Sequence, residues 1–284
     1  MRIANLDGTA VITSVGGGFR LAEADGGSFG GDPDDAVARI PEIEAWMARA
    51  RPTLDPALSM GALESQLLRL GPPVTRPRQI FAIGLNYRSH ADETGMQVPD
   101  HPMIFTKFPS ALAGPGASVV LPADTVDWEV ELVAVIGRGG RDIARSDALA
   151  CVAGFCVGQD LSERTLQMAN SPAQFSLAKS HAAFAPIGPW LTTLDELPDP
   201  LDLSIECRLG SETLQSARTS QMIFDVSYQI SYLSAVCELY VGDLVFTGTP
   251  DGVGFGRTPP RYLAAGDVLI SVIEGLGTLR TPCV

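Results

Sequence analysis

Cysteine and long apolar runs are both scarce in this 284-residue chain. The five cysteines are an odd number and form no Cys-x-x-Cys pair, so neither a disulfide framework nor a cysteine-bound zinc site is indicated. No apolar run reaches the ~18 residues of a membrane-spanning helix, and the first residues lack the apolar core of an export signal. Scattered thiols are typical of a reducing compartment, so we expect a cytoplasmic protein.

Positive charge is also in short supply. The chain has 20 Lys and Arg residues against 33 Asp and Glu residues, which gives a formal net charge of −13. A surface of this sign repels phosphate backbones and anionic lipids, so we expect neither a nucleic-acid partner nor a membrane partner. A small anionic substrate remains compatible with the composition, because a local Arg, Lys or metal ion can reverse the field at one site.

The chain is rich instead in short apolar stretches. Residues 1–72 read as short strands broken by Asp-Gly and Gly-Gly turns and then as helical patterns, which predicts a small N-terminal domain. Residues 73–284 open with a Pro- and Arg-containing stretch and continue as strand candidates with few helical patterns, which predicts a larger second domain. We therefore expect an α+β, strand-dominated fold and not a regular βαβ alternation.

The stretch VDWEVELVAVIG, residues 126–137, reads as a buried strand with three acidic residues on one face. Strand side chains alternate between faces, so Asp127, Glu129 and Glu131 share one side. A solvated face of an antiparallel sheet would explain this pattern. However, the stretch continues into an apolar run, and no Lys or Arg separates the acids. Three like charges repel one another unless a cation lies between them, which makes a metal site the alternative.

A third acidic residue could complete such a site. Asp160 follows the apolar strand in FCVGQDLSERTLQ, and with Glu129 and Glu131 it becomes a ligand candidate. Oxygen ligands suit hard cations such as Mg²⁺, Ca²⁺ or Mn²⁺. Considered alone, Asp160 could instead cap a helix that begins near Ser162.

Histidine is rare, with three in the chain. His90 and Glu93 are spaced i, i+3 and would meet on a helical turn, where a carboxylate orients an imidazole as a general base requires. An exposed helix salt bridge has the same spacing. His101 reads as a turn residue. Lys179 precedes a loop with Pro and Gly, and a lone Lys is normally a solvated surface charge.

The stretch GDLVFTGTPDGVGFG, residues 242–256, reads as a strand followed by a Gly-rich loop. It lacks the Gly-Lys-Ser/Thr ending of a P-loop and does not match Gly-x-Gly-x-x-Gly. The loop is either a cluster of β-turns or a set of backbone and Thr hydroxyl donors held near an anion.

Seven segments, in order, resemble the fumarylacetoacetate hydrolase family over about residues 80–284. They are GLNYRSHADE, PMIFTKFPSAL, DWEVELVAVIG, GFCVGQDLSERTLQ, AKSHAAFAPIGPW, GDLVFTGTPDGVG and LAAGDVLISVIEGLGTLRTP. The resemblance implies a mixed β-roll catalytic domain that forms a homodimer. It also implies that Mg²⁺ or Mn²⁺ is bound by Glu129, Glu131 and Asp160, which leaves Asp127 a supporting role.

The resemblance further implies a lid that carries a catalytic dyad of His90 and Glu93, with Lys179 as a third catalytic residue. The implied substrate-binding residues are Tyr87, Arg164, Gln167, His181 and Thr249. The chain departs from the family pattern at three places: Gln159 replaces the usual Asn, Thr165 replaces a common Asp, and the family's KSFDTF is KSHAAF. The last change alters volume and hydrogen bonding beside Lys179.

Members of this family cleave or rearrange 2-oxo acids. The resemblance therefore implies a metal-dependent hydrolase that cleaves a C–C bond of a 2,4-dioxo acid, either an acylpyruvate or a 2,4-diketo-3-deoxy sugar acid, to give pyruvate and a carboxylic acid. Two alternatives use the same metal site: isomerisation or decarboxylation of a 2-oxo-heptenedioate, and decarboxylation of oxaloacetate. A non-catalytic ligand-binding protein would not need a general base, so the dyad argues against that class.

Overall fold

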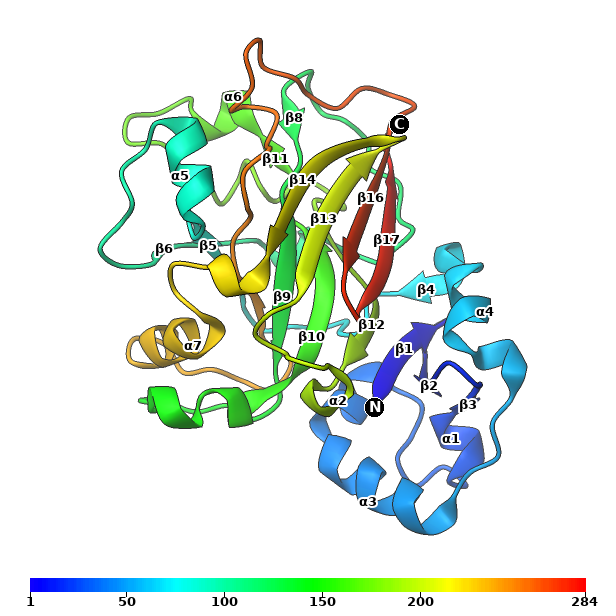
Figure 1. Ribbon diagram of the computed structural model, residues 1–284. Helices are drawn as coiled ribbons and strands as arrows, with labels where there is room; N and C mark the ends of the chain where they lie inside the picture. The colour runs from blue at the N-terminus through cyan, green and yellow to red at the C-terminus, as the bar shows by residue number, and fades with distance from the viewer.

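The computed structural model describes residues 1–284 and consists mainly of strands in two sheets that pack against each other (Figure 1). The larger sheet has 11 strands, of which nine run in the order β3 (Gly18–Arg20), β2 (Thr9–Thr13), β1 (Arg2–Leu6), β12 (Ala185–Thr192), β10 (Val152–Gln159), β9 (Val130–Ile136), β15 (Leu244–Phe246), β5 (Ile80–Gly84) and β6 (Met103–Thr106). Beside them, β4 (Leu70–Gly71) pairs with β1, and β7 (Leu112–Ala113) pairs with β12. The β15–β5 and β12–β7 pairs are parallel and the others antiparallel, so the sheet is mixed.

The smaller sheet covers the middle of the larger one. Its four strands run in the order β14 (Glu212–Arg218), β13 (Ser204–Leu209), β16 (Val268–Ile273) and β17 (Gly277–Pro282). In Figure 1 these strands lie over β9 and β10. Every residue of β9 is consequently buried, apolar on both faces apart from one glutamate. The predicted strand-dominated α+β class is confirmed.

The helices are short and lie around the sheets. They are α1 (Leu21–Ala24), α2 (Pro33–Ala38), α3 (Ile40–Ala50), α4 (Met60–Glu64), α5 (Arg88–Thr94), α6 (Arg164–Gln167) and α7 (Val226–Ser234). The first four surround β1–β3, whereas α5 and α6 lie together at the opposite end of the molecule (Figure 1). None of the helices combines the length and the apolar character needed to cross a membrane.

The N-terminal segment shares a sheet with the rest of the chain. Strand β1 pairs with β12, with Ile3 opposite Leu191 and Ala4 opposite Trp190. The boundary expected between residues 72 and 73 lies in the connection from β4 to β5. One buried apolar cluster contains residues from both sides of that boundary, including Ile3.

The acidic stretch expected as one strand forms two. Strand β8 (Val126–Asp127) pairs with β11 (Ser162–Glu163), and β9 begins only at Val130, in the larger sheet. At the break, the backbone N–H of Glu129 donates to Gln159 Oε1 and that of Val130 donates to Gln215 Oε1, each at 2.9 Å. Two side-chain amides thus replace the missing strand partner, which corrects the expectation of a continuous strand.

Candidate metal centre and active site

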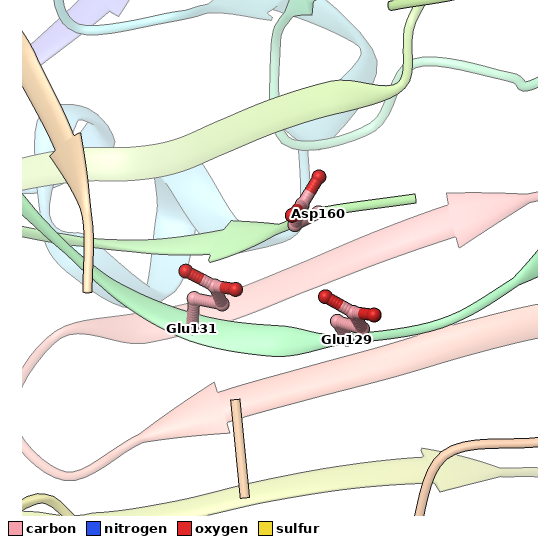
Figure 2. Close-up of side chains that lie close together, drawn as sticks. All are labelled: Glu129, Glu131 and Asp160. Atoms are coloured by element: carbon pink, nitrogen blue, oxygen red, sulfur yellow. The ribbon is translucent and has the colours of Figure 1, made fainter. Parts of the chain in front are cut away.

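Three buried carboxylates meet where β9 begins and β10 ends. Glu131 lies in β9, Glu129 directly precedes that strand, and Asp160 directly follows β10. The backbone N–H of Asp160 donates to Glu129 O at 2.9 Å, which joins the two strand ends. Each carboxylate offers an oxygen, and these oxygens lie within 4.8 Å of one another (Figure 2). Asp160 does not cap the next helix, because the N-cap of α6 is Glu163.

Two buried lysines bind this carboxylate cluster. Lys179 Nζ donates to Glu129 Oε2 at 2.8 Å and to Asp160 Oδ2 at 2.7 Å. Lys107 Nζ donates to Asp160 Oδ1 at 2.5 Å and to the backbone oxygen of Lys179. Lys107 is absent from the residues predicted from the sequence. A signal existed, however, because Lys107 and Lys179 are the only lysines in the chain.

The guanidinium of Arg164 joins the cluster to its surroundings. Its Nε donates to Asp127 Oδ2 at 2.9 Å, its Nη2 to Glu129 Oε1 at 2.7 Å, and its Nη1 to Gln167 Oε1 at 2.8 Å. Asp127 also accepts from the backbone N–H of Gly254 at 2.7 Å. Asp127 therefore orients Arg164 from outside the triad, as the sequence predicts.

The charges of this cluster favour a bound divalent cation. Four carboxylates, counting Asp127, meet three side-chain cations, and Glu131 accepts one hydrogen bond, from Gly248 N at 2.8 Å. Burial and the neighbouring Asp160 and Glu129 carboxylates raise the pKa of Glu131 well above its ordinary value. An uncompensated charge of this kind is costly inside a protein, and an all-oxygen donor set suits Mg²⁺ or Mn²⁺. The residues present therefore fit the metal that the resemblance implies.

Helix α5 holds the predicted dyad. His90 Nδ1 lies 2.7 Å from Glu93 Oε1, and Glu93 Oε2 accepts from the backbone N–H of Gly252 at 2.8 Å. Because the Glu93 carboxylate accepts the hydrogen bond, we assign the imidazole proton to Nδ1, which donates it. The lone pair of Nε2 is then free. His90 is buried, so the pair is not an exposed helix salt bridge.

His90 of the dyad and Glu129 of the carboxylate cluster line one small cavity of about 40 Å³. Its polar lining consists of His90, Thr94, Glu129, Arg164, Gln167, Lys179 and Thr249. Its apolar lining consists of Ile83, Leu85, Met96, Met103, Phe105, Met168, Phe175 and Phe255. The cavity thus combines charged and apolar side chains, and Lys179 Nζ lies 5.1 Å from the centroid of the Phe105 ring.

Two residues predicted to contact substrate lie outside this lining. Tyr87 is fully buried, and its hydroxyl has no hydrogen-bond partner. Burial and the charge of Glu131 raise the pKa of the Tyr87 phenol. His181 packs its ring against Phe184 at a centroid distance of 4.9 Å. The role of both residues in substrate binding stays a prediction.

The Gly-rich loop after β15 supports the site through its backbone. Its N–H groups donate to side-chain carboxylates: Gly248 to Glu131 at 2.8 Å, Gly252 to Glu93 at 2.8 Å, and Gly254 to Asp127 at 2.7 Å. The Thr249 hydroxyl donates to Val130 O at 3.0 Å and accepts from Gln215 Nε2 at 2.8 Å. These backbone donors therefore hold the protein's own acids in place. Thr249 also lines the cavity, and its role in substrate binding stays a prediction.

Known proteins of one family resemble this chain over most of its length. A family model described as fumarylacetoacetate (FAA) hydrolase C-terminal matches residues 79–284. The 2,4-didehydro-3-deoxy-L-rhamnonate hydrolase of Sphingomonas sp. (strain SKA58) is 46% identical over 249 residues, which are 87% of this chain and 86% of the relative. The mitochondrial oxaloacetate tautomerase FAHD2A of Bos taurus is 41% identical over 249 residues, covering 87% of this chain and 79% of the relative.

Solved structures give the same result for the fold. A Mycobacterium smegmatis protein matches with a TM-score of 0.92 and 49% identity, covering 100% of this chain and 99% of that chain. Maleylpyruvate hydrolase from Sphingobium sp. SYK-6, in complex with manganese(II) and pyruvate, matches with a TM-score of 0.79 and 27% identity. The match covers 100% of this chain and 99% of that chain.

Proposed function

The chain belongs to the fumarylacetoacetate hydrolase family, and on this premise we propose that it is a divalent-metal-dependent hydrolase that cleaves a C–C bond of a 2,4-dioxo acid. Water and the 2,4-dioxo acid are consumed, and pyruvate and a carboxylic acid are formed. The sugar-acid relative supports this choice, because its named substrate is itself a 2,4-dioxo acid. We also propose that the protein is a cytoplasmic homodimer.

The observation that carries the proposal is that His90, oriented by Glu93, lines the same cavity as the buried Glu129. A general base must lie within reach of the proton that it removes, and His90 lines the same cavity as Glu129 and Lys179. Glu93 is itself fixed by the Gly252 N–H, so the imidazole is held in one orientation.

Five of the titratable residues have a task in this reaction. When held by Glu129, Glu131 and Asp160, Mg²⁺ or Mn²⁺ supplies Lewis acidity at the 2-oxo acid. His90 Nε2 takes a proton from the water that attacks the C4 carbonyl. The C3–C4 bond then breaks, its electron pair stays on C3 as an enolate, and the proton held on His90 can return to C3 to give pyruvate. Lys179 opposes the negative charge that develops, a contact worth about 3 kcal/mol in preorganised sites.

The test is a metal-dependent screen with pyruvate detection. The wild-type protein should release pyruvate from acylpyruvates or from a 2,4-dioxo-3-deoxy sugar acid when Mg²⁺ or Mn²⁺ is present. His90→Ala should lower kcat by roughly 10²–10⁴-fold, the usual contribution of a general base, with Mn²⁺ affinity nearly unchanged. Full activity of His90→Ala would exclude this residue as the base, and inert 2,4-dioxo acids would exclude the hydrolase.

A second candidate is proton transfer on oxaloacetate, favoured by the similarity to the bovine oxaloacetate tautomerase. The same dyad could move a proton at C3 without attack by water. Enol oxaloacetate would then lose its ultraviolet absorbance without release of pyruvate, whereas a decarboxylase would release it. Isomerisation or decarboxylation of a 2-oxo-heptenedioate belongs in the same screen.

A further inference from the structure

Building on the proposed hydrolase, we propose that the acyl end of its substrate is short and uncharged, and that Met103, Met168 and Phe175 select it. The 2-oxo acid would lie against the charged lining residues, and the acyl group would contact the apolar lining residues. Substrates with a second, distal carboxylate would be rejected.

The side-chain cations that line the cavity, Lys179 and Arg164, are already paired with carboxylates of the protein, so neither is free to bind a second substrate carboxylate. Among the titratable lining residues, Lys179 is bound by Glu129 and Asp160, and Arg164 spans Asp127, Glu129 and a glutamine. His90 is bound to its own carboxylate partner. A distal carboxylate would therefore be desolvated without a counter-charge, which is strongly unfavourable.

Met103, Phe105, Met168 and Phe175 give the cavity an apolar wall. Met103 covers Gly84 so closely that a Cβ added at Gly84 would lie 2.3 Å from Met103 Cε. Phe175 packs edge-on against Phe105 at a centroid distance of 5.5 Å. Thioether and phenyl groups offer a carboxylate no N–H or O–H donor, but they gain from contact with a methyl or short alkyl chain. Met168 lies at the mouth, 38% exposed.

One polar group of the lining has a free hydrogen-bond donor. Gln167 Oε1 accepts from Arg164, while the Gln167 amide nitrogen donates no hydrogen bond within the chain. The hydroxyl of Thr94, by contrast, donates to His90 O at 2.9 Å. The Gln167 amide nitrogen can therefore donate to one carbonyl or hydroxyl oxygen of the acyl group. An acyl group with one hydroxyl fits, whereas a carboxylate does not.

Butyrylpyruvate and succinylpyruvate test this inference, because they differ in a terminal methyl against a terminal carboxylate. With Mn²⁺ bound, we expect kcat/KM to be about 100-fold higher for butyrylpyruvate, the order expected when a pocket leaves a polar group unpaired. Met168→Arg should raise the ratio of succinylpyruvate to butyrylpyruvate at least about tenfold. Met168→Gln is the matched control, because it adds polarity without charge, and it should leave the ratio nearly unchanged.

A binding measurement separates this inference from the proposed hydrolase. Titration of both compounds into Mn²⁺-loaded His90→Ala protein measures selectivity without turnover. If the wild-type protein cleaves neither compound but His90→Ala binds butyrylpyruvate more tightly, the hydrolase proposal fails and the selectivity stands. Equal binding and equal turnover of the two compounds would overturn the selectivity and leave the hydrolase intact. A preference for succinylpyruvate would overturn it as well.

Discussion

At the scale of single residues, Glu131 is the most revealing side chain of the site. It is fully enclosed and accepts one hydrogen bond, from Gly248, while Glu129 and Asp160 each bind a lysine. Burial of a carboxylate with so little compensation is unfavourable unless a cation completes the site. Of the three carboxylates, Glu131 is therefore the one whose burial most requires a bound cation.

We predict that Glu131→Gln weakens Mn²⁺ binding at least about 100-fold, since loss of outer-sphere partners alone typically costs 10–100-fold. The amide keeps the size of the side chain and removes its charge. Isothermal titration calorimetry measures the affinity. Glu163→Gln is the control, because Glu163 is similarly buried but caps α6 through the N–H groups of Thr165 and Leu166. Unchanged Mn²⁺ affinity in Glu131→Gln would refute the ligand assignment.

Lys107 supports the centre through Asp160 and two backbone carbonyls. Its removal would leave Asp160 Oδ1, Leu161 O and Lys179 O without this donor in a buried position. We predict that Lys107→Met lowers the free energy of unfolding by about 3–5 kcal/mol, the usual cost of breaking a buried ion pair on one side. Urea unfolding monitored by circular dichroism measures it.

The control for this prediction is an ion pair on the surface. Arg69 Nη2 lies 2.5 Å from Asp7 Oδ2, and both side chains are about half exposed. Exposed pairs contribute little, so Arg69→Met should leave the unfolding midpoint almost unchanged. Equal effects of the two substitutions would show that Lys107 has no special structural role.

The sequence predicts some of these residues better than others. Strand alternation brings Glu129 and Glu131 to one side, and the i, i+3 spacing places His90 against Glu93, because both signals are local. Lys107 reaches Asp160 across 53 positions of the sequence. No periodicity encodes such a contact. The hints are the scarcity of lysine and the position of Lys107 in PMIFTKFPSAL, one of the segments that resemble the family.

At the scale of elements, the acidic stretch is divided between two strands, β8 and β9. An uninterrupted strand would have been consistent with the apolar and acidic pattern, and the sequence predicts one. The break depends on Gln159 and Gln215, whose amides accept from the two freed backbone N–H groups. Gln159 also donates to Ser271 Oγ at 2.8 Å, which joins the larger sheet to the smaller one. These contacts become visible only once both sheets are assembled.

Helix α5, which carries His90 and Glu93, ends at a glycine in a left-handed conformation. Gly95 adopts a left-handed conformation, with φ 68°, and its N–H closes the last turn on Ala91 O and Asp92 O. An alanine there costs about 1 kcal/mol, because its Cβ is disfavoured at positive φ. We predict that Gly95→Ala speeds amide hydrogen exchange over residues 88–95 by about fivefold and lowers kcat.

Gly61, in α4, serves as the control for the Gly95 substitution. It has no neighbour within 4 Å of an added Cβ and no positive φ, so Gly61→Ala should be neutral or slightly stabilising. If Gly95→Ala left exchange in α5 unchanged, the left-handed cap would not control the opening of this helix. Accelerated exchange throughout the chain would point to global destabilisation instead of local opening.

At the scale of the whole molecule, the N-terminal segment extends the main sheet. Strands β3, β2 and β1 continue from β12, and Leu6 packs in a buried cluster with Trp190 of β12. Turn and helix signals in residues 1–72 correctly indicate strands followed by helices. They do not indicate the partner of β1, because the β1–β12 pairing joins positions nearly two hundred residues apart.

This shared sheet predicts that the chain unfolds as one cooperative unit. Leu6→Ala should cost about 2–5 kcal/mol, as large-to-small changes in a core do. If unfolding is cooperative, the slowest-exchanging amides of β9 and β10 should lose protection by that same free energy, although Leu6 belongs to another part of the sheet. Hydrogen exchange with mass spectrometry measures both regions in one experiment.

Leu68→Ala is the control, at an 85% exposed position of the same segment, and it should change neither the stability nor the protection of β9 and β10. Loss of protection confined to residues 1–72 would mean that this segment folds as a separate domain, and that the β1–β12 pairing does not couple it to the metal-binding strands.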